Sequence, residues 1–133
     1  MADDIIRNMN NCIFCKLIAK EIPSFLIEEN EQVITFLSLE NHPLVVPKKH
    51  IQDIYSLDKK TGNYLMEEIT RVATATKKGM ESDGIYITQA NGKAAGQDVF
   101  HLHFHIYPKW ENSEIDMETL TKEEIVEKIK SVL

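Results

Sequence analysis

The sequence GQDVFHLHFHIYP, residues 96–108, decides the fold. Within it, histidine and apolar residues alternate, and side chains on a β-strand point alternately to its two faces. We therefore predict a strand over residues 102–107 with one apolar face and one histidine face. The apolar face carries Leu102, Phe104 and Ile106, and the other carries His101, His103 and His105. Successive imidazoles would be roughly 6.5–7 Å apart.

The chain outside this stretch predicts the other elements. Segments rich in Ile, Val, Phe and Thr predict further strands at residues 25–29, 32–37, 44–46 and 84–90. Helical spacing predicts one long helix between an N-cap at Asp58 and a stop at Gly79. A short helix is predicted at residues 12–19, and the capping-box pattern Thr121-x-x-Glu124 predicts a C-terminal helix. This order favours an α+β fold whose antiparallel sheet has about five strands.

Length and composition indicate one domain, because 133 residues with 43% hydrophobic content suit a single core. We divide it into a core at residues 12–110 and an acidic extension at residues 111–133. The extension holds seven acids and three lysines, a charge of −4 out of the total of −6. We expect the extension to be a solvated tail, with a capping or partner-contacting role as the alternative. We expect the stretch from Glu111 to Glu118 and the polar N-terminus to be flexible.

The charge pattern and the cysteine count narrow the partners and the location. The core is nearly neutral and has no basic stripe, so we expect no nucleic-acid partner. No apolar run approaches the roughly 20 residues that span a bilayer, so we expect no membrane partner. Two cysteines are too few for a disulfide scaffold, which favours a cytoplasmic protein, with a nuclear location left open.

Three imidazoles on one strand face suggest either a metal cluster or a nucleophile with helpers. Their predicted spacing is too wide for all three to ligate one ion, whose nitrogen ligands lie about 2.0–2.1 Å away. The middle imidazole, His103, is then flanked by two others. A neutral imidazole is a good nucleophile when a hydrogen bond fixes its tautomer, and flanking donors can stabilise charge on phosphoryl oxygens.

The loop that precedes the histidines suits a phosphate group. It runs from Asn91 to Asp98, and Gly96 within it lets backbone amides approach a ligand, while Asn91 and Gln97 offer neutral donors. Alone, such a loop is better interpreted as a simple turn. Its position directly before the histidines favours a binding role.

The pair Cys12 and Cys15 has three interpretations: a metal knuckle, a redox pair, or two small buried hydrophobes. A thioredoxin-like redox pair would require a βαβ unit, which the sequence does not predict. Zinc would require two more ligands. His50 and His101 can complete a tetrahedral Cys2His2 set, and His101 is preferred because it lies at the beginning of the strand.

The residues described so far resemble the histidine-triad family. The resemblance rests on GQDVFHLHFHIYP, CIFCKLIAKEIPS, EENEQVITFL, HPLVVPKKH and the Asn91-Gly pair, and it covers roughly residues 12–110. It implies a homodimer formed through the long helix and a shared sheet edge. It also implies attack by the middle histidine on the α-phosphorus of a nucleotide, with a nucleotidyl-histidine intermediate that water resolves.

The resemblance assigns roles to individual residues. His103 would attack, His105 would bind phosphate, Gln97 would lie near the leaving group, and His42 would support the site. An apolar slot for the base would be formed by Ile13, Phe14, Leu17, Phe36 and Leu39. The zinc-binding branches of the family imply zinc at Cys12, Cys15, His50 and His101.

The sequence departs from the family where the ribose would bind. Where the family usually has an aspartate, this sequence has Ser38. The loop between Leu37 and His42 is also several residues shorter than is usual in the family. We therefore expect the ribose to be recognised by a different arrangement of residues. Our hypothesis is a hydrolase or nucleotidyl transferase that acts on purine nucleoside phosphoramidates or small nucleotide anhydrides through His103. The alternative is a non-catalytic nucleotide-binding or adaptor module.

Overall fold

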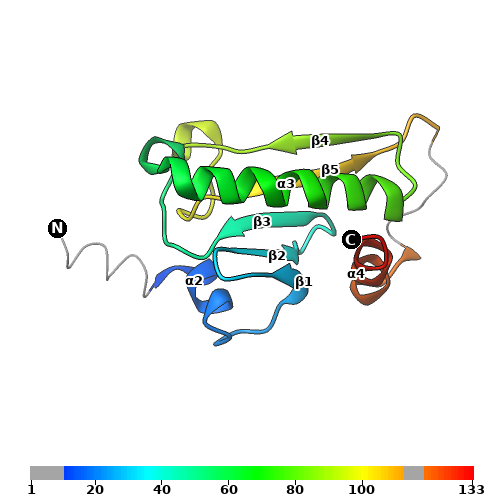
Figure 1. Ribbon diagram of the computed structural model, residues 1–133, viewed down its shortest axis with the longest axis horizontal. Helices are drawn as coiled ribbons and strands as arrows, with labels where there is room; N and C mark the ends of the chain where they lie inside the picture. Colours follow the sequence, from blue (N-terminus) through cyan, green and yellow to red (C-terminus); the bar gives the residue numbers. More distant parts are fainter. Residues whose placement is uncertain (1–10, 113–118) are drawn as a thin grey trace.

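The computed structural model describes residues 11–112 and 119–133 (Figure 1). Both segments predicted to be flexible therefore lie largely outside the described residues. The strands are β1 (Phe25–Glu29), β2 (Val33–Leu37), β3 (Pro43–Pro47), β4 (Gly84–Thr88) and β5 (Phe104–Lys109). The helices are α2 (Ile13–Ile18), α3 (Lys59–Gly79) and α4 (Lys122–Lys130), with single 3-10 turns η1 (Ile54–Ser56) and η2 (Lys93–Ala95). Within these described ranges, none of the helices has the length and apolar character needed to cross a membrane.

The five strands form one sheet in the order β1-β2-β3-β5-β4, and every neighbouring pair is antiparallel. The predicted α+β fold with an antiparallel sheet is confirmed. Strand β5 enters between β3 and β4, where Leu44 pairs with His105 and Thr88 pairs with His105 from the other side. The histidine segment therefore lies in the interior of the sheet rather than at its edge.

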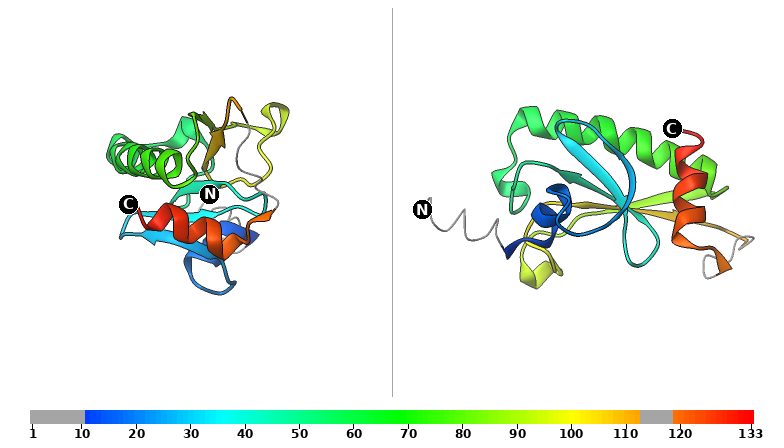
Figure 2. Two further views of the ribbon diagram at one scale, coloured as in Figure 1. Left: turned by 90° about the vertical axis from the view of Figure 1, so that its right-hand side faces the viewer. Right: turned by 90° about the horizontal axis from the view of Figure 1, so that it is seen from below.

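Helix α3 runs along one face of the sheet, as Figures 1 and 2 show. The side chain of Asp58 accepts a hydrogen bond from the backbone N–H of Thr61, which is the predicted N-cap. The buried stripe of this helix packs against alternate residues of the central strands. This core contains Val33, Val45, Ile51, Leu65, Ile69, Val72, Leu102 and Ile106.

Helix α2 packs on the opposite face, because the other alternate residues of β2 and β3 point there. That second core contains Cys12, Phe14, Leu17, Ile34, Phe36, Leu44 and Val46. Both β2 and β3 are consequently buried on both faces. The short helix is thus pressed against the face of the sheet on which His105 lies.

The C-terminal extension is more closely packed than its charge suggested. Thr121 and Glu124 form the predicted capping box, and Ile125 and Ile129 of α4 are buried against β1 and α3. Gly79 is required here, since a Cβ at this position would lie 2.4 Å from the carbonyl oxygen of Lys128. Helix α4 (orange to red in Figure 1) therefore belongs to the core of the protein, and the expectation of a solvated extension is wrong for these residues.

Strand β5 begins two residues later than predicted. His101, Leu102 and His103 precede the strand, and only His105 of the three histidines lies within it. The backbone N–H of Leu102 donates to the carbonyl oxygen of Ile51 rather than to a neighbouring strand. This turns the approach to β5 toward the segment that follows β3.

Helix α3 carries a buried carboxyl group, that of Glu68. The hydroxyl of Thr35 donates to Glu68 at 2.8 Å, and Arg71 binds Glu28 at 2.9 Å. Burial, followed by the hydrogen bond with Glu28, raises the pKa of Glu68 to about 7. Since this pKa exceeds the ordinary value of 4.5, the folded state binds a proton more tightly than the unfolded chain. The contribution of Glu68 to stability is therefore lost as the pH rises from about 4.5 to about 7.

Glu68→Gln should stabilise the protein at pH 8 by roughly 1–3 kcal/mol and have little effect at pH 5. Glutamine resembles the protonated acid, since its carbonyl can accept from Thr35 and its amide can donate to Glu28. Urea unfolding at the two pH values measures the difference. Glu67, an exposed neighbour of Glu68 on α3, provides the matched control. Glu67→Gln should change the free energy of unfolding by less than about 0.5 kcal/mol at both pH values. Equal effects of Glu68→Gln at both pH values would contradict this account.

Candidate active site and metal centre

The rings of His103 and His105 lie closer together than the spacing predicted for a regular strand. The ring centroids of His103 and His105 are 4.9 Å apart, and the two rings meet edge to face. Phe14 of α2 packs against the His103 ring at 5.1 Å. His103 is only 6% exposed. It is therefore held between the helix and the entry to β5.

One hydrogen bond fixes the tautomer of a neutral His103 ring. Its Nδ1 lies 2.7 Å from the backbone carbonyl oxygen of His101. Because a carbonyl oxygen can only accept, Nδ1 must carry the hydrogen. The neutral ring then has its lone pair on Nε2, which is the form that can attack an electrophile.

His105 continues into a second chain of polar contacts. Its Nδ1 lies 2.9 Å from Nε2 of His42, and Nδ1 of His42 lies 3.1 Å from Oγ of Ser38. The Ser38 oxygen also accepts backbone N–H groups of Glu40 and His42, both at 3.2 Å. Ser38, at the position of the family's usual aspartate, is thus engaged in orienting His42.

Tyr107 extends the imidazole row and was not predicted. Its ring stacks on His42 at 4.0 Å and lies parallel to His105 at 5.7 Å. A signal was present in the sequence, because residue 107 continues the alternation of residues 101, 103 and 105.

The imidazoles around His103 are neutral at physiological pH. Burial, followed by His105, lowers the pKa of His42 to about 4. Burial also lowers the pKa of His105, with a further contribution from His103. Neutral rings can act as hydrogen-bond donors and acceptors toward a ligand without repelling one another.

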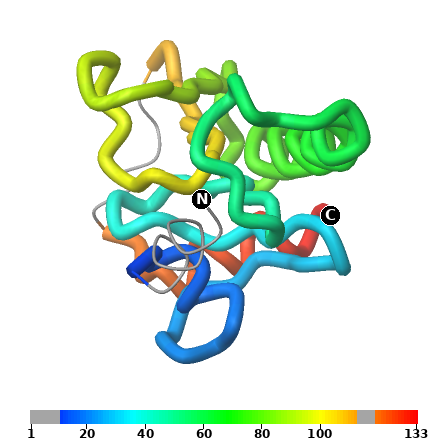
Figure 3. The backbone as a smooth tube through the Cα atoms, turned by 90° about the vertical axis from the view of Figure 1, so that its left-hand side faces the viewer, coloured from blue at the N-terminus to red at the C-terminus, as the bar shows by residue number. Residues whose placement is uncertain are grey.

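The loop before the histidines is held by the side chains predicted to bind phosphate. The Gln97 amide donates to the carbonyls of Gln52 (2.7 Å) and Val99 (3.1 Å), and its oxygen accepts from Gly92 N–H at 2.7 Å. Asn91 accepts from the backbone N–H of Ile54 at 2.8 Å. Figure 3 shows this yellow segment beside the green-cyan segment that follows β3. Gln97 and Asn91 therefore shape the loop, and Gly96 has the positive φ of 96° that its turn requires.

Asp98 is the loop residue nearest the candidate nucleophile. Its Oδ1 lies 3.6 Å from Nε2 of His103 and accepts the backbone N–H of Val99 at 2.9 Å. The Asp98 side chain is 79% exposed. The exposed carboxylate of Asp98 therefore lies close to Nε2 of His103.

The residues predicted to form the base slot separate into buried and exposed groups. Phe14, Leu17 and Phe36 are buried in the core under α2, while Ile13 is half exposed. Leu39 is 89% exposed and does not join this core. The short loop between β2 and β3 directs Leu39 outward, while the Ser38 hydroxyl bonds to His42.

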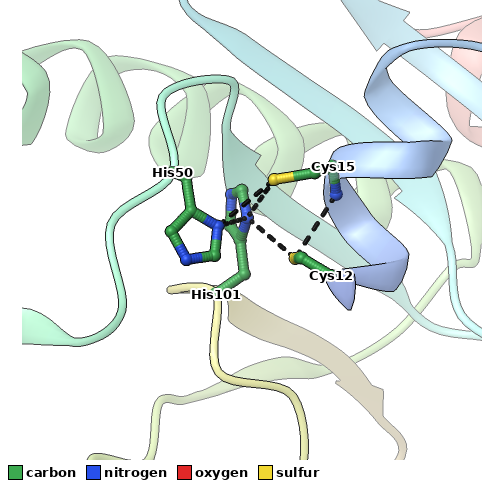
Figure 4. Close-up of side chains that lie close together, drawn as sticks. All are labelled: Cys12, Cys15, His50 and His101. Carbon is green, nitrogen blue, oxygen red and sulfur yellow. Dashed lines mark hydrogen bonds between the residues drawn. The ribbon is translucent and has the colours of Figure 1, made fainter. Parts of the chain in front are cut away.

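The second cluster joins Cys12, Cys15, His50 and His101 (Figure 4). Their ligand atoms all lie within 4.8 Å of one another. Nδ1 of His101 is 3.3 Å from Cys12 Sγ and 3.5 Å from Cys15 Sγ, and Nδ1 of His50 is 3.2 Å from Cys15 Sγ. The α2 turn supplies both sulfurs, because Cys12 is the N-cap and Cys15 lies three residues later.

The donor set of this cluster fits a tetrahedral metal ion. Bonds of about 2.0–2.3 Å to nitrogen and sulfur place neighbouring ligands about 3.3–3.8 Å apart, close to the separations above. The Nε2 of His101 donates to the carbonyl of Pro47 at 2.8 Å, so its Nδ1 is free to ligate. Burial, followed by Cys12, raises the pKa of Cys15 to about 12, and a metal cation would reverse this shift with release of a proton. These four residues can hold a metal.

Comparison with known proteins agrees with this architecture. The HIT domain model matches residues 19–112. A HIT-like protein from Bartonella henselae superimposes with a TM-score of 0.84 at 39% identity, covering 93% of this chain and 98% of that one. A zinc-bound histidine triad family protein from Mycobacterium smegmatis gives a TM-score of 0.83 at 28% identity, covering 93% and 94%.

A curated relative with a named activity is also similar. Adenosine 5'-monophosphoramidase HNT1 of Saccharomyces cerevisiae is 34% identical over 125 residues, covering 84% of this chain and 77% of that protein. The fold and site define a small α+β protein with buried imidazoles at a strand entry beside a cluster that can bind metal. The chain belongs to the HIT family.

Proposed function

We propose that the protein is a nucleotidyl hydrolase that cleaves purine nucleoside phosphoramidates, or small nucleotide anhydrides, at the α-phosphate. The observation that carries this proposal is the hydrogen bond from His103 Nδ1 to the His101 carbonyl, which leaves the lone pair on Nε2. The similarity to the yeast adenosine 5'-monophosphoramidase supports the substrate class.

The reaction has two steps. The Nε2 lone pair of His103 forms a bond to the α-phosphorus, while the phosphorus–nitrogen bond breaks and the amine leaves with the electron pair and a proton from water. Water then attacks the same phosphorus, the bond to Nε2 breaks, and the electron pair returns to the imidazole. The proton that the attacking water releases replaces the one that the amine took from solvent. The products are the nucleoside monophosphate and the free amine.

Other residues would bind and orient the substrate. Because Ser38 Oγ accepts two backbone N–H groups, its hydroxyl would donate to Nδ1 of His42, and Nε2 of His42 would donate to Nδ1 of His105. The hydrogen of neutral His105 would then lie on Nε2, which would donate to a phosphoryl oxygen. Gln97, Asn91 and Gly96 would present the backbone of the loop. Of the residues predicted to form the base slot, the half-exposed Ile13 would contact the base.

We further propose that the metal at Cys12, Cys15, His50 and His101 is zinc. Two thiolates and two imidazoles are typical zinc ligands, and the zinc-bound relative supports the assignment. Four protein ligands leave no open position for water, so zinc would be structural. Through His50 it would connect α2 to the segment that follows β3. Through His101 it would connect α2 to the residues just before His103.

We also propose a homodimer and a cytoplasmic location. Strand β4 is a sheet edge with exposed Tyr86 and Ile87, and α3 exposes Met66. Light scattering that finds a monomer would exclude the dimer.

The thiols that would bind zinc stay reduced in the cytoplasm, and cell fractionation tests the location.

The decisive experiment is to mix the protein with adenosine 5'-phosphoramidate and quench the reaction with denaturant. The mass of the protein and of its peptides is then measured by mass spectrometry. We expect an adenylyl adduct on the peptide that contains His103, and release of AMP. Binding of nucleotide without adduct or product would instead support the non-catalytic binding module.

A further inference from the structure

A cavity lies next to the loop residue that contacts the candidate nucleophile. It has a volume of about 380 Å³, and its wall is formed by Asn11, Cys12, Ile13, Gln52, Asp98, Val99 and Phe100. Asp98 is the one acidic residue among them. It belongs both to the wall of the cavity and to the immediate surroundings of His103 Nε2, 3.6 Å away.

The carboxylate is held in this position by the loop. Its Oδ1 accepts the N–H of Val99, and the preceding residue, Gln97, is buried and donates to the carbonyl of Gln52, a residue of the cavity wall. Among the residues that the structure describes, no lysine or arginine lies within 4 Å of Asp98. Its negative charge is therefore available to a ligand.

The position of Asp98 gives it influence over the group that leaves phosphorus. When Nε2 attacks, the leaving atom lies in line with Nε2 on the far side of phosphorus, and the exposed Asp98 carboxylate, 3.6 Å from Nε2, borders this line of attack. A negative charge in that position attracts a cationic leaving group and repels an anionic one. Because Asp98 is largely exposed, each of these effects is moderate.

We propose that Asp98 selects leaving groups that carry positive charge, such as diamines, and that the adjacent cavity accommodates their substituents. This inference rests on the proposed hydrolase function and specifies its substrate class. In the step concerned, the phosphorus–nitrogen bond breaks, and the leaving nitrogen keeps the electron pair and takes a proton from water. The distal ammonium of the same leaving group remains protonated and faces the carboxylate.

The experiment compares three adenosine 5'-phosphoramidates of equal length. Their leaving amines end in an ammonium, a methyl and a carboxylate group. We expect wild-type protein to prefer the first over the third by kcat/KM. Asp98→Asn should reduce that ratio roughly fivefold to twentyfold, because two moderate charge effects are lost together. High salt should reduce the wild-type ratio in the same direction.

For each variant, kcat/KM for the ammonium substrate is divided by kcat/KM for the carboxylate substrate. A general loss of activity lowers both values and does not obscure their ratio. Glu127→Gln, which removes an exposed acid on α4, is the matched control and should leave the ratio unchanged. An Asp98→Asn ratio equal to that of wild type overturns the inference while the hydrolase proposal stands. Failure of wild-type protein to cleave any of the three overturns both.

Discussion

His103→Ala should lower kcat for adenosine 5'-phosphoramidate by at least about 10⁴-fold. The reason is that Nε2 of this ring carries the only lone pair that the His101 carbonyl has positioned for attack. Neither alanine nor asparagine at this position can form the covalent intermediate. Steady-state assays of AMP release measure the loss, and the adduct should be absent from both variants.

Two controls separate loss of chemistry from loss of fold. His103→Asn keeps a polar side chain in the buried position and should retain the circular dichroism spectrum of the wild type. His105→Asn removes a donor to phosphate rather than the nucleophile and should cost only about 10²–10³-fold. Retention of more than about one percent of wild-type activity by His103→Ala would refute attack by this residue.

Removal of the metal should produce the largest change in stability. Protein purified without added metal should contain about one equivalent of zinc. Chelation should lower the free energy of unfolding by roughly 4 kcal/mol, the linkage expected for a ligand present at about a thousand times its Kd. The melting temperature should then fall by roughly 10–20 °C. Calorimetry before and after chelation measures the shift.

The same loss should follow from mutation. Cys12→Ser with Cys15→Ser should yield metal-free protein whose stability no longer responds to the chelator. His42→Asn is the matched control, because it removes a buried imidazole outside the cluster and should keep its zinc. A wild-type protein that lacks zinc and has reactive thiols at both cysteines would contradict the assignment.

Much of the fold could be predicted because local pattern and tertiary packing agree. Strands β1 and β2 begin or end within a residue of prediction, and Asp58 caps α3 as its sequence indicated. The start of β5 was missed, since a tertiary hydrogen bond from Leu102 to Ile51 replaces strand pairing there. The packing of α4 was underestimated, because an apolar stripe on a short acidic helix does not reveal that the helix packs against β1 and α3.

The candidate site shows a similar division. Spacing alone could nominate Cys12, Cys15 and the histidines, but only the folded chain brings His50 to the cysteines across 35 positions. The roles of loop side chains were harder to predict, because Gln97 and Ser38 satisfy backbone groups that a sequence does not reveal. Leu39 shows the limit of transferring a residue by alignment, since a shortened loop leaves it in solvent.

The hydrogen bond that defines the tautomer of His103 ends on a main-chain oxygen, and this has an evolutionary consequence. Any amino acid at position 101 supplies the same carbonyl. A lineage can therefore lose the cysteines, or exchange His101 for another residue, and still inherit a correctly protonated His103. Selection can act separately on the candidate metal site and on the tautomer of His103, although both depend on residue 101.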